Sequence, residues 1–234
     1  MEQPQTRSVS IHQPNYIPWL GYFYKIYQTD YFVFLDDAQF SNEGMHNYHY
    51  IKTRNGSQRI KIPVFQTLGD KICEVRIKNE FDWREKHLYM LKDNYSLTRH
   101  FTEVFSDFVS LIYENHEFLS GLNTSIIKFF CNKLGIETKF VKSSDLNIYT
   151  VREAKIIDIC TALQCDLYLS GTGAGAYQKE EHFLEKGIRL KYSEYNTFPY
   201  EQQFPGFRSN VTILDYLMNC GYNWDLVLKY QTHT

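Results

Sequence analysis

The chain has 234 residues, of which 43% are hydrophobic and 22% are charged, a composition that excludes wholesale disorder. Its 25 Lys and Arg against 27 Asp and Glu give a formal net charge of -2, and this lack of basic excess argues against nucleic-acid binding. The five scattered cysteines, the polar N-terminal residues and the absence of a long apolar run predict a cytoplasmic protein without disulfides or membrane segments.

The N-terminal part of the chain predicts a strand, a helix and a second strand in succession. A short apolar run at 9–13 stops at Pro14, and apolar residues at helical spacing then predict a helix from Pro18 to about residue 28. The continuous apolar run at 31–35 predicts a buried strand that ends at Asp36 and Asp37. This βαβ order predicts a parallel sheet.

The middle of the chain has the pattern of a hairpin followed by helices. Asn55 and Gly56 lie between extended segments at 48–53 and 57–64, and an Asn-Gly pair in that position favours a β-hairpin. A further strand is expected at 73–77. Helices are expected at 81–95, 100–113 and 118–134, the last ending at Gly135. We therefore expect residues 41–135 to form a hairpin-plus-helices insertion between the two halves of the sheet.

The C-terminal part returns to alternating strands and helices. Thr150 and Glu153 have the spacing of a capping box, which predicts a helix as far as Leu163. Strands are predicted at 137–141, 166–170 and 188–192, and helices at 180–185, 211–219 and 224–230. The chain is therefore predicted to be a single α/β domain over residues 1–234, with a parallel, Rossmann-like sheet flanked by helices.

Three residues at predicted strand ends are the candidate catalytic groups. Ligands of open parallel sheets bind where strands hand over to helices at their carboxyl ends. His12 ends the first strand, and Asp36 and Asp37 end the second. A histidine can act as a general base, and a carboxylate can orient it or hold an amine. The alternative is that His12 only ends its strand and that the aspartates cap a loop or are solvated.

A glycine-rich segment, 170–175, follows the predicted strand at 166–170. Its small residues would let a ligand approach the backbone, although it lacks both the P-loop motif and the dinucleotide-binding glycine spacing. We expect this segment, His12 and Asp36 to meet at the carboxyl edge of the sheet, with Asp36 nearest to His12. The aromatic and amide-rich loop at 195–209, which includes Arg208, is expected to cover that edge. The alternative is that the segment 170–175 is only a tight turn and that the loop 195–209 only packs against the rest of the chain.

His46 and His49 lie at the start of the predicted hairpin. Two histidines three residues apart share a face of a helix, but in a strand they point to opposite faces. One of them lining the site is therefore favoured over a metal site. A metal-dependent hydrolase using these histidines with Asp36 and Asp37 remains a third functional alternative.

The segment from Ile11 to Phe23 resembles the WbqC-like protein family. The resemblance continues through 30–33, 35–40, 60–64, 168–171, Tyr177 and 209–221, so it covers nearly the whole chain. It departs at 45–50, where the family usually carries a tryptophan and an Asn-Arg-Asn-like run. The positions that match the family's pattern are His12, Gln13, Asn15, Tyr16, Trp19, Gly21, Asp36, Asp37, Gln39, Asn47, Ser170, Gly171, Tyr177 and Asp215. The predicted substrate-binding residues are Gln13, Asn15, Tyr16, Trp19, Gln39, His46, Asn47, Ser170, Gly171, Tyr177 and Arg208.

The family's members occur with genes for surface-polysaccharide biosynthesis, such as O-antigen, and for other biosynthetic routes. The resemblance implies a small-molecule aminoacyl or acyl transferase. Such an enzyme joins an activated acyl unit, for example a glycyl thioester on an acyl carrier protein, to an amine on a sugar nucleotide or similar acceptor. No cofactor, metal, nucleic acid or membrane is expected to take part. The alternative is a nucleotide- or sugar-binding protein without chemistry of its own.

The order of the first elements is also similar to the opening of nucleotidyltransferases and pantothenate-synthetase-like enzymes. Those enzymes carry a His-x-Gly-His motif where this chain has Trp19-Leu20-Gly21-Tyr22. Because both histidines are missing, the sequence argues against adenylyl transfer by that route. This second similarity implies a nucleotidyltransferase-type sheet, and it supports the fold and not the chemistry.

Overall fold

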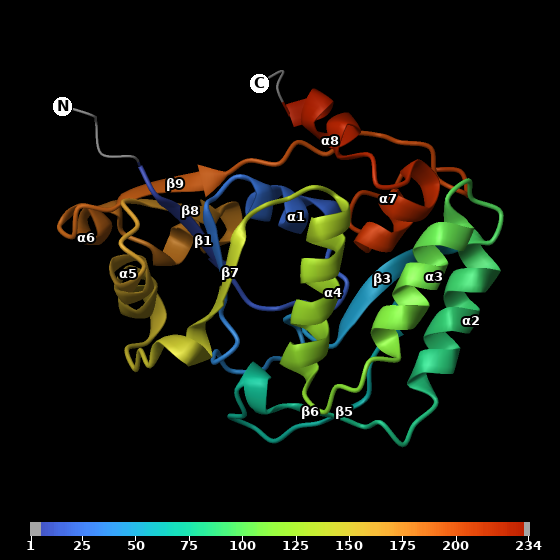
Figure 1. Ribbon diagram of the computed structural model, residues 1–234, viewed down its shortest axis with the longest axis horizontal. Helices are drawn as coiled ribbons and strands as arrows, with labels where there is room; N and C mark the ends of the chain where they lie inside the picture. The colour runs from blue at the N-terminus through green and yellow to red at the C-terminus, as the bar shows by residue number, and fades with distance from the viewer. Residues whose placement is uncertain (1–5, 232–234) are drawn as a thin grey trace. The chain divides into compact units, whose positions relative to one another are not determined.

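A computed structural model describes residues 6–231 (Figure 1). The chain divides into two compact units. Unit 1 contains the chain up to Gln13, Tyr24–Asp37 and Ile136–Tyr195. Unit 2 contains Pro14–Phe23, Ala38–Gly135 and the chain from Asn196 onward. The segment expected as an insertion, 41–135, thus belongs to a unit that also takes in residues from both ends of the chain, and a single domain over 1–234 stays a prediction.

Unit 1 is built on a five-stranded parallel sheet, which confirms the predicted α/β class. Its strands are β1 Ser8–His12, β2 Tyr31–Phe34, β7 Lys139–Lys142, β8 Leu167–Gly171 and β9 Arg189–Ser193. They lie in the order β7-β2-β1-β8-β9, and each neighbouring pair is parallel. Numbered by chain order within the sheet this is 3-2-1-4-5, the order of the doubly wound Rossmann type.

Alternating side chains of the central strands build two apolar layers. Val9, Ile11 and Val33 point to one face, where they join a core formed with α5 Arg152–Ala162 and α6 Glu180–Leu184. Phe32 and Phe34 are fully buried and form a cluster of rings with Phe140 of β7. This period-2 alternation is the geometry of a strand, and burying each such side chain contributes roughly 1.5–3 kcal/mol.

The start of α5 differs from the predicted capping box. Val151 is the N-cap residue, and no side chain caps the helix there. The Thr150 hydroxyl donates instead to Asp158 at 2.6 Å. The Glu153 carboxylate accepts a hydrogen bond from the backbone N–H of Lys179 at 2.6 Å and pairs with His182. The prediction was wrong because Glu153 makes long-range contacts, which sequence spacing does not reveal.

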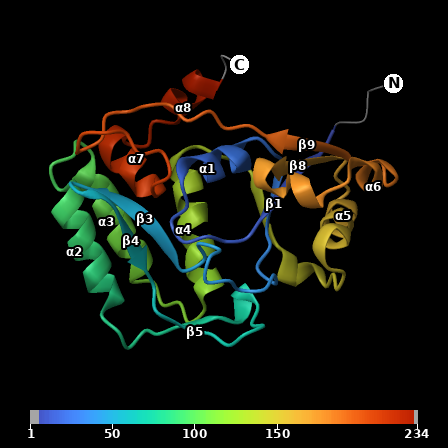
Figure 2. The same ribbon diagram turned by 180° about the vertical axis from the view of Figure 1, so that it is seen from behind.

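Unit 2 combines a hairpin with helices (Figure 2). The hairpin strands β3 Tyr48–Thr53 and β4 Gly56–Lys61 pair with Thr53 opposite Gly56, whose φ of 120° suits only glycine. The helices are α2 Trp83–Tyr95, α3 Phe101–Ile112, α4 Leu119–Lys133, α7 Ile213–Cys220 and α8 Trp224–Gln231. Figure 2 shows α2 and α3 alongside the hairpin. The hairpin and the mid-chain helices therefore lie within a few residues of their predicted positions.

Shorter elements complete the two units. The strand expected at 73–77 is reduced to β6 Arg76–Ile77, which pairs with β5 Val64–Phe65, because the 3-10 turn η1 Ile72–Glu74 takes up the preceding residues. Helix α1 spans Leu20–Tyr27, and the 3-10 turns η2 Ser143–Leu146 and η3 Thr172–Tyr177 follow β7 and β8. Within residues 6–231, no helix is long and apolar enough to span a bilayer.

Candidate active site

The sheet of unit 1 has its topological switch point between β1 and β8. From β1 the chain adds β2 and β7 on one side, and it later adds β8 and β9 on the other. Ligands of open α/β sheets bind outside the carboxyl ends of the strands at this position. His12 is the last residue of β1 and Gly171 the last of β8, and extending the register of Val9 opposite Tyr168 puts the two level with each other. The strand order thus brings these two predicted residues to one edge.

The His12 imidazole contacts the backbone of the next residue. Its Nδ1 lies 3.0 Å from the carbonyl oxygen of Gln13. Since a carbonyl can only accept, Nδ1 carries the hydrogen in the neutral ring and Nε2 carries the lone pair. The side chain is half-buried, and the backbone carbonyl of His12 accepts a hydrogen bond from the N–H of Leu35 at 2.9 Å. In the tautomer that donates to this carbonyl, Nε2 is the ring nitrogen that can accept a proton, as a general base must.

Lys25 is a residue at this edge that the sequence analysis missed. It comes from α1, is 6% exposed, and its amine donates to the carbonyl oxygen of Ile11 at 2.9 Å. A Cβ placed on Gly171 would stand 4.0 Å from the same amine, which therefore lies between the ends of β1 and β8. Burial lowers the pKa of Lys25 to about 7. The only sequence signal is a lysine three residues after Tyr22, inside an otherwise apolar helix.

Two hydroxyls hold the Lys25 helix against β1. Ser10 and Thr29 are buried, and their hydroxyls lie 3.1 Å apart. The Ser10 hydroxyl also donates to the backbone carbonyl of Lys25 at 3.4 Å. The position of the Lys25 amine is therefore set by the backbone at both ends of its side chain.

Small residues line the exit of β8. Ser170 is fully buried, and its hydroxyl lies 3.4 Å from the carbonyl oxygen of Gly171. A Cβ on Gly173 would meet no atom within 4 Å, so the backbone there is open to approach. Tyr177 ends η3, and its side chain lies outside the described part of the chain. The segment is a 3-10 turn that leaves room for a ligand against the backbone.

Asp36 and Asp37 both have partners within unit 1. Asp36 is 1% exposed and accepts hydrogen bonds from the backbone N–H of Ser144 at 3.0 Å, the Ser144 hydroxyl at 2.9 Å and the Ser143 hydroxyl at 3.3 Å. Asp37 accepts from the Ser143 hydroxyl and pairs with Lys155 of α5. These contacts tie the end of β2 to η2 and α5. A chemical role for either carboxylate stays a prediction.

Three predicted substrate-binding residues near the start of the chain lie in unit 2. Tyr16 is fully buried, and its hydroxyl donates to Nδ1 of His87 at 2.9 Å. The Trp19 ring lies against Gly21, where a Cβ would come within 2.4 Å of it. Asn15 is buried, and its Oδ1 makes no hydrogen bond. Their packing explains the residue types at these positions, and their roles in binding stay predictions.

The predicted residues around the hairpin also belong to unit 2. His46 is 1% exposed and packs its ring 5.4 Å from that of Phe40, and burial lowers its pKa to about 4. Asn47 is buried and donates to the carbonyl oxygen of Ile62 at 2.8 Å. Gln39 is exposed and forms an isolated bridge with the chain at Lys71. The structure therefore divides the predicted substrate-binding residues between the two units.

The loop expected to cover the sheet edge is anchored inside unit 2. Asp215 is fully buried and accepts hydrogen bonds from the hydroxyls of Tyr95 and Tyr200, both at 2.9 Å, and from the Gln202 amide at 2.7 Å. Arg208 is exposed, and its backbone bonds both ends of the Gln202 amide. Asp215 thus holds the loop through its side chains, and the covering role stays a prediction.

A family model described as the WbqC-like protein family matches residues 13–224. The chain belongs to this family. His12 stands one residue before the matched segment, whereas Lys25, Asp36 and Gly171 lie within it. The chain is also 36% identical over 230 residues to a protein of Mycobacterium tuberculosis named "Uncharacterized protein Rv1507c", covering 96% of this chain and 98% of that protein. No solved structure matches.

The thiols and the metal-binding side chains of this WbqC-like protein bear on two possibilities, a cysteine nucleophile and a metal site. Burial raises the pKa of Cys160 to about 12 and those of Cys165 and Cys220 to about 11, and it also raises that of Cys131. These four thiols are therefore protonated at neutral pH and unsuited to nucleophilic attack. Over residues 6–231, no group of three or more His, Cys, Asp or Glu side chains is arranged to hold a metal ion.

Proposed function

We propose that this WbqC-like protein is a biosynthetic aminoacyl or acyl transferase. It would transfer an activated acyl unit, such as a carrier-protein thioester of glycine, to the amine of a sugar nucleotide or similar small molecule. The observation that carries the proposal is the position of the His12 imidazole at the switch point of a parallel sheet, with its Nδ1 3.0 Å from a backbone carbonyl oxygen. The free state of all five cysteines supports a reducing compartment, the cytoplasm.

The reaction requires one proton acceptor and no protein nucleophile. The neutral acceptor amine attacks the thioester carbonyl, a C–N bond forms and the C–S bond breaks. Nε2 of His12 takes the proton from the attacking nitrogen and returns it to the leaving thiolate. Because four of the cysteine thiols are protonated, direct transfer of the acyl unit is favoured over a covalent acyl-enzyme intermediate on any of those thiols.

In this proposal, Lys25 supplies a positive charge that stabilises an anionic group of the ligand. Its amine lies beside Gly171 and the end of β1, where an anionic group would be stabilised by the protonated form. Because its pKa is about 7, the arrival of an anion would raise the fraction of protonated Lys25. Lys25 would therefore assist in holding the thioester oxyanion or a ligand phosphate, without forming a bond to the acyl group.

The test is a mass-spectrometric assay with the full chain. The protein is incubated with amino-sugar nucleotides and a panel of aminoacyl carrier proteins, and mass gain on the acceptor is followed. His12→Gln should lower turnover at least about a hundredfold, since general base catalysis contributes that much or more. His182→Gln, at a more exposed histidine of the same unit, is the matched control. Absence of mass gain across the whole panel would overturn the proposal.

A second candidate is a binding protein without chemistry of its own. The observation that favours it is that both carboxylates already have partners. Asp36 and Asp37 accept hydrogen bonds from serine hydroxyls and a backbone N–H, and Asp37 also pairs with Lys155. Under this alternative, ligands raise the melting temperature without turnover, and His12→Gln changes affinity alone. Under the transferase proposal, the same variant loses turnover and largely keeps ligand binding.

A further inference from the structure

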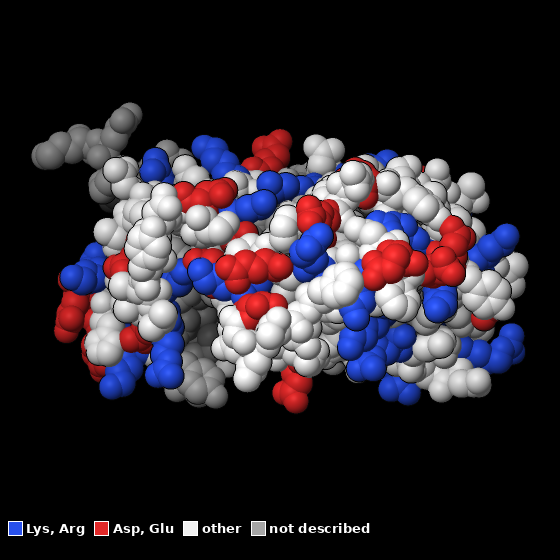
Figure 3. All heavy atoms as spheres, turned by 90° about the horizontal axis from the view of Figure 1, so that it is seen from below, with Lys and Arg blue, Asp and Glu red and all other residues white. Residues whose placement is uncertain are grey.

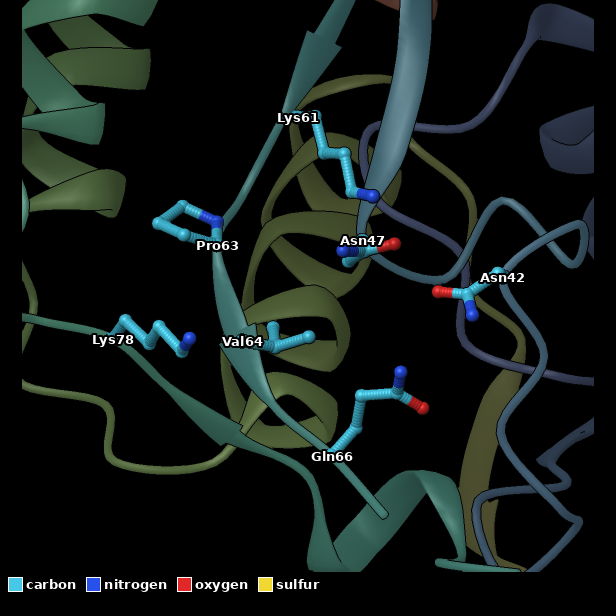
Figure 4. A pocket seen from close by; sticks show the side chains of 7 residues that line it. All are labelled: Asn42, Asn47, Lys61, Pro63, Val64, Gln66 and Lys78. Atoms are coloured by element: carbon cyan, nitrogen blue, oxygen red, sulfur yellow. The ribbon is translucent and has the colours of Figure 1, made fainter. Parts of the chain in front are cut away.

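The end of the hairpin and the short ribbon of β5 and β6 border an open polar pocket of about 340 Å³ in unit 2 (Figure 4). Its polar walls are two lysines and three amides, from Lys61, Lys78, Asn42, Asn47 and Gln66. Figure 4 shows Lys61, Asn42 and Gln66 arranged around Asn47, with Lys78 on the other side of β5. The lining includes no carboxylate. The pocket therefore offers positive charge and amide groups together.

A second pocket of about 360 Å³ adjoins the first, because Lys61 and Pro63 line both. It adds the cations Arg59 and Lys86, and again no carboxylate is among its lining residues. It also has an apolar wall that includes Phe81, which is 52% exposed. The two pockets together join a cationic region to an accessible aromatic ring.

The four cations of these pockets are not neutralised by ion pairs. In the part of the chain that the structure describes, none of Arg59, Lys61, Lys78 and Lys86 is within ion-pair distance of a carboxylate. The Lys78 ammonium lies instead 4.9 Å from the centre of the Phe65 ring and 5.9 Å from that of the Phe81 ring. Figure 3, seen from the side of β5 and β6 in Figure 1, shows Lys and Arg side chains gathered on one part of this face. Such unbalanced charge attracts anions.

Asn47 provides a second, independent indication of a ligand. It is 1% exposed, and its amide nitrogen is used by the carbonyl oxygen of Ile62 at 2.8 Å. Its Oδ1 is buried at the wall of the first pocket and has no hydrogen-bond partner. A buried acceptor left without a donor destabilises the folded chain. A ligand hydroxyl or N–H group that enters the pocket would remove this cost.

We propose that unit 2 binds a nucleoside phosphate across these two pockets. The phosphates lie against Lys61, with Lys78 across β5 adding a second positive charge, and a ligand hydroxyl donates to Oδ1 of Asn47. The base lies against Phe81, because stacking of a base on an exposed aromatic ring stabilises binding. The site consists of unit 2 residues alone, so it does not depend on acyl transfer at His12.

The experiment is titration calorimetry of the full chain with uridine and adenosine diphosphates, with pyrophosphate and with pantetheine 4′-phosphate. We expect saturable binding of a nucleoside diphosphate at least tenfold tighter than that of pyrophosphate. Lys61→Gln and Lys78→Gln should each weaken both ligands about tenfold. Phe81→Ala should weaken the nucleotide alone. Lys92→Gln, at an exposed lysine of α2 outside both pockets, should change neither.

Several results would overturn the proposal. Among them are no saturable binding of any nucleotide, equal affinity for nucleotide and pyrophosphate, and unchanged affinity in both lysine variants. Tighter binding of pantetheine 4′-phosphate than of the nucleotides would assign the pocket to a carrier-protein arm and would also overturn it. Nucleotide binding with no acyl transfer would contradict only the proposed function, and acyl transfer without nucleotide binding would contradict only this site.

Discussion

The side-chain amine of Lys25 donates a hydrogen bond to the carbonyl oxygen of Ile11 at 2.9 Å, at the switch point of the sheet. This contact places an ionisable group where a parallel sheet of this strand order binds its ligands. Within residues 6–231, no carboxylate lies within ion-pair distance of Lys25 to offset its charge. The amine is therefore able to change its charge in the neutral pH range when a ligand arrives.

The lowered pKa of Lys25 predicts a pH-dependent stability that Lys25→Met removes. Between the folded pKa of about 7 and the usual 10.5, the unfolded chain binds one more proton at Lys25, so stability rises with pH. From pH 7 to 9.5 the native protein should gain about 3 kcal/mol of unfolding free energy relative to Lys25→Met. Urea unfolding across this range measures it. Lys186→Met, at an exposed lysine of unit 1, should show no such change, and a pH-independent difference for Lys25→Met contradicts the prediction.

The burial of His46 predicts sensitivity to acid. Its ring packs on Gly44, where a Cβ would stand 2.1 Å from Nε2, and its folded pKa is about 4 against a usual 6.5. Below pH 6.5 the unfolded chain binds the extra proton, so this contribution to stability is complete above pH 6.5 and is lost as the pH falls toward 4. His46→Leu should therefore gain about 2 kcal/mol relative to the native protein between pH 7 and pH 5. Acid unfolding followed by circular dichroism measures the shift, with His182→Gln as the exposed control.

Local patterns in the sequence were sufficient to predict the first parallel strands and the hairpin. The apolar runs ending at His12 and Phe34 became neighbouring parallel strands, because a βαβ order has few other arrangements. The pair Asn55 and Gly56 marked the hairpin, since a turn of that type needs a residue that tolerates positive φ. In both cases the physical cause acts over a few residues and is visible in the sequence.

Contacts between distant residues were not predictable in the same way. Thr150 and Glu153 have capping-box spacing, but the Glu153 carboxylate bonds residue 179 instead. Lys25 has the sequence appearance of a solvated helix residue, and only the fold shows that it is buried beside Gly171. The exits of β1 and β8 were predicted to share an edge, and the strand order confirms this. The hydrogen bonds of Asp36, by contrast, come from Ser143 and Ser144, more than a hundred residues away in the sequence.

Replacement of Asp36 should destabilise unit 1. Asp36→Asn keeps the size of the side chain but removes the charge that accepts the hydrogen bonds from Ser143 and Ser144. We expect a loss of about 1–3 kcal/mol of unfolding free energy, measured by urea unfolding. Ser144→Ala removes one of the same bonds and should cost less. Loss of turnover in folded Asp36→Asn protein, absent in Ser144→Ala, would assign Asp36 the chemical role predicted from the sequence, whereas unchanged stability of Asp36→Asn would contradict the structural role.

Substitutions of Gly171 should affect ligand binding without affecting folding. Its φ of -82° and ψ of 147° are open to any residue, and a Cβ there would stand at 4.0 Å, an ordinary contact distance, from the Lys25 amine. Gly171→Ala should therefore leave the melting temperature nearly unchanged or raise it slightly, since alanine reduces the entropy of the unfolded chain by about 0.4–1 kcal/mol. The larger Gly171→Val fills the space beside the end of β1 that a ligand needs. We expect the acyl transfer of Gly171→Val to fall at least tenfold while the protein stays folded. Gly187→Ala is the control for Gly171→Ala, because a Cβ at Gly187 also has open space but the backbone there has a positive φ of 71°. Full turnover by folded Gly171→Val would show that the ligand does not approach this backbone, and it would remove the switch point from the active site.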